Sequence, residues 1–271
     1  MERRFPLRGK LALILGLVPP VLYLLANHSG MLLVQLGDLA FTLFAGSCSI
    51  LAFLMIRRTG WHSRLGFMYA GMFASMLLIF SGSVVDCYYV FMLQVTVPSP
   101  SVADIFNFLG YACAAGAALQ FLWYFRTAFT HWRYRLVPLI GLLVAGPNIC
   151  LSHPNLAMQT PLIADATWLA YPVLDATLLV LAIMLLLLFS GGFVSSPWRW
   201  FAIGLIFITV ADSAVGVGNI EGWSQFVQPL CLFYFWGYIC LGLGFSLMPK
   251  PRRLHPLERD YHKAKFMQPV T

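Results

Sequence analysis

The sequence predicts an all-α protein, a polytopic bundle of about eight membrane-spanning helices. Of its 271 residues, 60% are hydrophobic and 10% are charged, and the mean hydropathy is +0.79. The apolar residues fall in long runs, and about 18 to 20 residues are needed to cross a hydrocarbon core of about 30 Å. These runs leave no room for a soluble domain. We therefore expect one membrane bundle over residues 1–249 and a basic cytoplasmic tail over residues 250–271.

Eight apolar runs follow one another along the chain. The expected spans cover residues 11–26, 31–56, 65–95, 102–125, 136–151, 168–190, 200–218 and 226–248. The first is expected to remain as a span, because no small-x-small cleavage site of a signal peptide follows it. The fifth is the shortest and contains Pro138 and Pro147, so we expect it to be kinked or partly re-entrant.

The basic residues predict the orientation of these spans. All seventeen Lys and Arg residues lie before the first run, after the second, fourth and sixth runs, or beyond the eighth. The loops on the opposite side contain none. By the positive-inside rule the basic side is cytoplasmic, and an even number of spans places both termini there. Because these residues flank spans instead of forming a stripe among aromatics, we expect no nucleic-acid binding despite the net charge of +7.

Seven of the ten acidic residues lie at the end of the spans opposite the basic side, in the loops or just inside the spans. At 1.5 Å per residue, four of them lie roughly 9 to 13 Å inward from the outer ends of their spans: Asp38, Asp86, Asp175 and Asp212. Asp104 lies about one turn inside the fourth span, and Asp165 and Glu221 are expected in loops. Because a charged group that faces lipid is costly, the carboxylates should face the bundle interior. Every Lys and Arg is about 20 Å or more away, so no cationic side chain should pair with them there.

Three ways of compensating these carboxylates remain open: protonation, hydrogen bonds from polar neighbours, and a cation or cationic ligand from outside. Polar residues at helical spacing favour a shared pocket; Gln35 and Thr42 flank Asp38, and Thr209 precedes Asp212. The candidate ligand-binding residues are Asp38, Asp86, Asp104, Asp175, Asp212, Asn107, Tyr111 and Tyr171. We expect no catalytic residue, metal site or cofactor, because the six cysteines have no metal-binding spacing and no soluble catalytic signature occurs.

Each acid also has a purely structural interpretation. Ser101 and Asp104 fit a capping box that starts the fourth helix. Asp175 could act as an early-helix acid that is favourable to the helix dipole. The other three, Asp38, Asp86 and Asp212, lie too deep for capping and could hydrogen-bond between helices as part of the packing.

Short motifs in this chain resemble the multi-span sensory membrane region that precedes GGDEF or histidine-kinase output domains in bacteria. The resemblance covers roughly residues 35–249. Its motifs are Pro100-Ser-Val-Ala-Asp104, Phe108-Leu-Gly-Tyr111, Ala170-Tyr-Pro-Val-Leu-Asp175, Ala211-Asp212 and Gly237-Tyr-Ile-Cys-Leu-Gly-Leu-Gly with Pro249. It implies a bacterial inner-membrane bundle that perceives a signal from the periplasm or the membrane.

The chain departs from that pattern because no output domain follows the last span. Signalling would then need a separate cytoplasmic protein, and the basic tail is the expected contact for that protein or for anionic lipid. The order of acids also resembles, more weakly, the intramembrane lysoplasmalogenase group, whose carboxylates would perform acid and base chemistry on an ether lipid. A proton- or cation-coupled transporter is the third alternative. The sequence names neither ligand, nor partner, nor oligomeric state.

Overall fold

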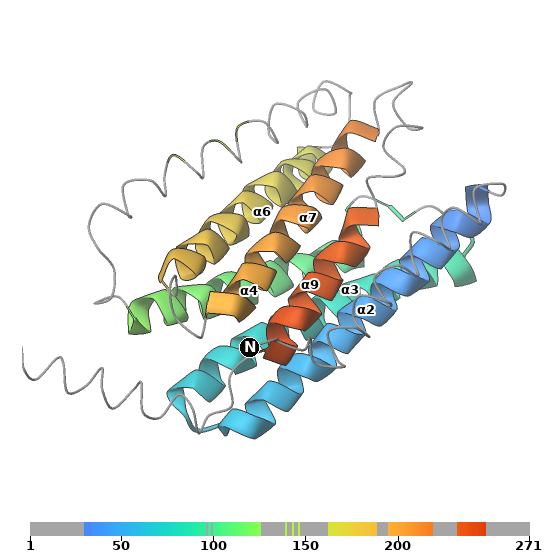
Figure 1. Cartoon of the computed structure of the whole chain (residues 1–271). Coiled ribbons are helices and arrows are strands. Elements are labelled where there is room, and N and C mark those ends of the chain that lie inside the picture. Colours follow the sequence, from blue (N-terminus) through green and yellow to red (C-terminus); the bar gives the residue numbers. More distant parts are fainter. Residues whose placement is uncertain are drawn as a thin grey trace, which may run out of the picture.

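In the computed structural model the described residues form α-helices, and none of them lies in a strand (Figure 1). It describes residues 30–95, 97–98, 100–125, 162–188, 195–218 and 232–247, with the isolated positions 139, 143 and 146. The helices are α2 (Gly30–Thr59), α3 (Arg64–Cys87), the π-helical turn η1 (Tyr88–Met92), α4 (Val102–Tyr124), α6 (Leu162–Leu188), α7 (Ser195–Gly218) and α9 (Leu232–Leu247). The predicted all-α class is confirmed for these residues; the expected first span, the tail and most of the fifth span lie outside them.

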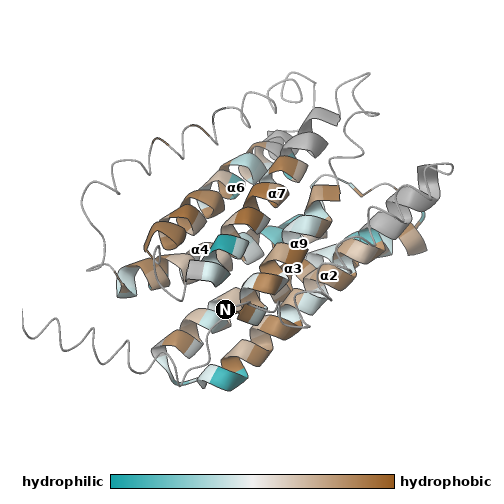
Figure 2. Ribbon diagram, in the orientation of Figure 1, coloured by the Kyte–Doolittle hydropathy of each residue, from teal (hydrophilic) through white to brown (hydrophobic). Residues whose placement is uncertain are grey.

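Within the described residues, four segments are long and apolar enough to cross a membrane: Asp38–Thr59, Leu65–Met92, Val102–Tyr124 and Leu169–Leu188. Hydrophobic residues cover most of the length of the helices (Figure 2). Many of them face outward; Ile105 is 60% exposed and Leu119 is 55% exposed. An outer surface of large apolar side chains is unusual for a protein in water and typical of one that faces lipid.

The six helices form a closed ring in chain order. The main contacts run from α2 to α3, α3 to α4, α4 to α6, α6 to α7 and α7 to α9, and α9 returns to α2. Helices α2, α4, α6 and α9 run in one direction and α3 and α7 run in the other, as the residue pairs in contact show. The ring has two chemically different ends. The end at which α2 finishes and α7 begins, called here the basic end, carries Arg57, Arg58 and Arg199. The other end, called the acidic end, carries Asp38, Asp86, Asp104, Asp175 and Asp212.

A tight turn at the basic end connects α2 to α3. Gly60 has a φ of +90°, a conformation that favours glycine, and it ends α2 after Thr59. Ser63 then caps α3, because its Oγ accepts a 2.8 Å hydrogen bond from the N–H of Gly66. This turn fixes α2 and α3 as antiparallel neighbours and so brings Asp38 and Asp86 to the same end.

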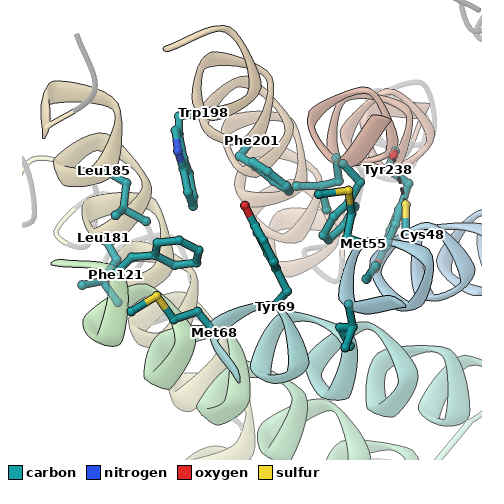
Figure 3. Packing of buried hydrophobic residues seen from close by; sticks show 14 of the residues in the cluster. Cys48, Met55, Met68, Tyr69, Phe121, Leu181, Leu185, Trp198, Phe201 and Tyr238 are labelled. Atoms are coloured by element: carbon teal, nitrogen blue, oxygen red, sulfur yellow. Dashed lines mark hydrogen bonds between the residues drawn. The ribbon is translucent and has the colours of Figure 1, made fainter. Parts of the chain in front are cut away.

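The hydrophobic core is concentrated toward the basic end (Figure 3). Trp198 of α7 packs edge-on against Phe121 of α4, with ring centroids 5.1 Å apart, and at 5.4 Å from Phe201. Phe201 in turn contacts Phe245 of α9 with the rings 4.9 Å apart. Aromatic pairs in these arrangements contribute beyond their buried area. The basic end therefore joins α4, α7 and α9 through rings, whereas the acidic end joins them through polar groups.

Small residues allow close helix contacts at two places in the ring. On α4, buried Ala103, Gly110 and Ala117 repeat every seven residues and pack against α3. On the other side, a Cβ at Gly204 of α7 would lie 2.8 Å from the carbonyl oxygen of Gly237 of α9. Such contacts are the usual means of holding helices together in lipid, where burial of apolar surface gives little driving force.

Helix α6 differs from the expectation. It begins at Leu162, so Asp165 lies within the helix and the prediction that it lies in a loop is wrong. A hydropathy window detects only the apolar part of a helix, whereas the backbone continues its hydrogen bonds through Asp165 and Thr167. Pro172 also lies inside α6, where it cannot donate to the carbonyl group four residues earlier.

Candidate functional site

The most deeply buried acid is Asp175 of α6, which is 4% exposed. The hydroxyl of Tyr111 on α4 donates a 2.5 Å hydrogen bond to its Oδ1. Because α6 begins at Leu162, Asp175 lies about three and a half turns into the helix and cannot stabilise its first turn. The early-helix interpretation of Asp175 is wrong, and its contact instead connects two helices.

Asp212 of α7 makes the corresponding contact with α9. Its Oδ1 accepts a hydrogen bond from the hydroxyl of Tyr234. Its second oxygen, Oδ2, is buried and has no hydrogen-bond partner in the described part of the chain. The carboxyl groups of Asp212 and Asp175 lie within hydrogen-bonding reach of each other. Four helices therefore meet through two tyrosine–aspartate contacts and one aspartate pair.

Asp104 at the start of α4 has two roles. Its Oδ2 accepts a 2.6 Å hydrogen bond from the N–H of Ser101, which confirms the predicted capping box. Its Oδ1 accepts a 2.6 Å hydrogen bond from the hydroxyl of Tyr171 on α6, and the amide of Asn107 donates to that same hydroxyl at 3.3 Å. Capping and interhelical contact are thus combined in one carboxylate.

The remaining two candidate acids lie at the α2–α3 side of the ring. Asp86 is within electrostatic range of both Asp38 and Asp104, so these three carboxylates share one region. Thr42 donates to the backbone carbonyl of Asp38 at 2.8 Å, so it does not solvate the carboxylate, and the side chain of Gln35 lies outside the described residues. Both Asp38 and Asp86 are partly exposed. Solvent or a ligand can reach them, unlike Asp175.

No arginine in the described part of the chain pairs with these carboxylates. From Asp38 to Arg57 along α2 the rise is about 28 Å, and from Arg199 to Asp212 along α7 it is about 20 Å. Asp104, Asp175 and Asp212 instead accept hydrogen bonds from tyrosine hydroxyl groups. Among the described residues no three His, Cys, Asp or Glu side chains are placed to hold a metal ion together.

A surface depression of about 380 Å³ adjoins Asp104 at the acidic end. It is open to the outside and largely apolar, and its lining residues are Tyr89, Pro100, Ser101, Val102, Asp104, Ile105, Phe108 and Thr167. The ring of Phe108 lies 5.0 Å from that of Tyr171. The depression therefore connects the outer surface with the Tyr171–Asp104 contact.

Tyr234 is the member of the cluster that the sequence interpretation missed. Counted from residue 226, it lies about 12 Å inside the expected eighth span, which is the depth of the acids. The same counting that selected the aspartates would have selected it. Tyr88, by contrast, is exposed, and its ring lies edge-on to that of Tyr89 with the centroids 6.4 Å apart.

The fold defines this chain as an all-helical protein with several helices able to cross a bilayer. Its distinguishing feature is the cluster of five aspartates and three tyrosines at one end of the ring. No family model, no curated protein and no solved structure matches the chain.

Proposed function

We propose that this protein is a multi-pass sensor of the bacterial inner membrane, with eight spans and both termini in the cytoplasm. Its acidic end faces the periplasm and binds a proton, a small cation or a small cationic ligand. The bound state changes the packing of the helices, and a separate cytoplasmic protein reads that change at the basic end or at the tail.

The observation that carries this proposal is the buried Oδ2 of Asp212, which lies beside Asp175 and has no hydrogen-bond partner among the residues that the structure describes. Two adjacent carboxylates in a medium of low dielectric repel each other strongly unless a positive charge or a proton lies between them. A site that needs a proton or a positive charge responds to the protons and cations that the outer solution supplies. Because α4, α6, α7 and α9 all contribute to it, its occupancy affects the whole ring.

The lysoplasmalogenase-like alternative receives less support from the same geometry. A hydrolase must bring its carboxylates to a lipid bond, yet Asp175 is buried and the free oxygen of Asp212 faces the bundle interior. Asp104, which borders the open depression, already serves Ser101 and Tyr171. For a transporter, the alternation of access would need a second opening toward the basic end, where the aromatic core is packed.

The topology is tested by cysteine labelling at two exposed positions. Trp61 is 52% exposed in the α2–α3 turn, and Val97 is 37% exposed in the α3–α4 connection. In a variant whose native cysteines are replaced by serine, we expect a membrane-impermeant thiol reagent added to intact cells to label V97C but not W61C. Permeabilised cells should show both labelled. Labelling of W61C alone in intact cells would reverse the orientation and remove the periplasmic site.

The sensor function is tested by hydrogen exchange of the purified protein in lipid nanodiscs. Lowering the pH, or adding sodium or tetramethylammonium chloride, should change exchange, expressed relative to the intrinsic rate at each pH, by several-fold in peptides of the basic end, near residues 57–64 and 195–200. The response should be lost in D175N and D212N and kept in D260N, a tail variant that serves as the matched control. The same samples are incubated with lysoplasmalogen vesicles.

The outcomes separate the candidate functions. An exchange response without lipid product supports the sensor. Release of an aldehyde or a glycerophospholipid headgroup, abolished by D175N or D212N, would establish the hydrolase instead. No exchange response to any of the three probes would overturn the proposed function.

A further inference from the structure

The hydrogen-bond donors and acceptors around Asp175 and Asp212 indicate what this aspartate pair binds. Carboxylates accept hydrogen bonds but cannot donate them. Tyr111 supplies a donor to Asp175 and Tyr234 supplies one to Asp212, each at an Oδ1 atom. The contact between the two carboxyl groups has no donor among the described residues, and Oδ2 of Asp212 has no partner there either.

We propose that Asp175 and Asp212 bind one shared proton, which forms the missing hydrogen bond between α6 and α7. This inference rests on the proposed function and names the ligand of its buried site. The proton comes from hydronium in the water at the acidic end: one O–H bond of hydronium breaks, one O–H bond forms on either carboxyl group, and the pair then carries one negative charge instead of two. A metal ion is less suitable, because the described residues provide no third carboxylate, His or Cys beside the pair.

The groups that face the pair are mostly neutral hydroxyls, so they leave it without a counter-charge. From α4 and α9 these are Tyr111, Tyr234 and Tyr238, with Cys48 of α2 behind Tyr238 and Tyr171 of α6 nearby. The other acids that lie in the same region are Asp104, Asp86 and Asp38. Binding of one proton therefore supplies the absent hydrogen-bond donor and also reduces the repulsion between the two carboxylates.

Loss of this proton would place two negative charges side by side and push α6 and α7 apart at the acidic end. At the basic end, Leu181 and Leu185 of α6 lie in the same hydrophobic cluster as Trp198 and Phe201 of α7 and hold these two helices together. The two helices would thus open about this apolar contact as a hinge. The tyrosines extend the movement to α4 and α9, since each tyrosine is hydrogen-bonded to one member of the pair.

Infrared spectroscopy of the protein in nanodiscs tests this inference directly. A protonated carboxyl group gives a carbonyl stretching band that shifts in heavy water. We expect D175N and D212N each to reduce this band by the intensity of one protonated carboxyl group. The double variant should reduce it by no more than either single variant. This non-additive loss is the signature of one proton that needs both residues. D260N serves as the control and should leave the band unchanged.

The alternative outcomes are distinct. Additive losses in the two variants would show two separate protons and overturn the sharing. An unchanged band in both variants would overturn the inference as a whole. If either variant fails to fold, wild-type protein decides the question by exchange of sodium for choline at constant ionic strength. An unchanged band and unfolding temperature support the proton, whereas a fall in unfolding temperature identifies a bound sodium ion and overturns it. If the infrared data show a shared proton but hydrogen exchange at the basic end does not respond, the proposed sensor function is refuted and the shared proton stands.

Discussion

Replacement of Gly204 by alanine is expected to destabilise the protein by about 1–3 kcal/mol. The added Cβ would lie 2.8 Å from the backbone carbonyl oxygen of Gly237 and 3.2 Å from side-chain atoms of Cys240 and Leu241. A backbone oxygen cannot rotate away as a flexible side chain can, so α7 and α9 must separate. Thermal unfolding in detergent, or unfolding with increasing sodium dodecyl sulfate, measures the effect.

Gly116 of α4 is the matched control for this substitution. It lies within a helix like Gly204, but a Cβ there would have no other atom within 4 Å. Alanine increases intrinsic helix stability by roughly 0.5–1 kcal/mol at both positions. G116A should therefore be neutral or slightly stabilising, and the difference between the two variants isolates the helix contact. Equal stability of G204A and G116A would contradict the close packing of α7 on α9.

The second large effect is expected for Tyr111→Phe, which retains the ring and removes the hydroxyl that bonds Asp175. Because Asp175 is buried, water cannot replace that donor, and the loss should cost roughly 1–2 kcal/mol, near the upper end for hydrogen bonds between membrane helices. Chemical unfolding of the purified protein measures this change in the free energy of unfolding.

Tyr171→Phe provides the comparison. It removes an equally short hydrogen bond, but Asp104 is partly exposed and keeps its hydrogen bond from the N–H of Ser101. We expect a cost below about 1 kcal/mol. A Y111F substitution made in the Asp175→Leu background should have little further effect, because the acceptor is already gone. If Y171F were the more costly variant, burial would not be the factor that decides between the two contacts.

The helices themselves were predictable because apolar runs measure a property of the residues alone. Counting along those runs also placed five aspartates toward one end, and the structure agrees because α2, α4 and α6 begin at that end and α3 and α7 finish there. The start of α6 could not be obtained in this way, since helical hydrogen bonds extend beyond the apolar segment. The π-helical turn at Tyr88–Met92 is likewise a backbone shift without a hydropathy signal.

The pairing within the cluster was outside the reach of sequence reasoning. Asp175 and Asp212 are separated by a connection and by most of two helices, and their meeting depends on how α6 and α7 are rotated about their axes. Tyr171 lies four residues before Asp175 on the same helix, but the observed partner of Asp175 is Tyr111 on another helix. Tyr171 instead contacts Asp104. Helical spacing describes neighbours on one helix, whereas here each polar contact is made between helices.

The two roles of Asp104 have a mechanical consequence. Its carboxylate secures the amide of Ser101 with one oxygen and the α6 tyrosine with the other, so displacement of α6 pulls on the residue that ends the α3–α4 connection. A sideways shift of one helix is thereby converted into fraying of the first turn of its neighbour. The segment that leads into α4 would then change its own shape with the position of α6, and a molecule bound at the outer surface could recognise that change.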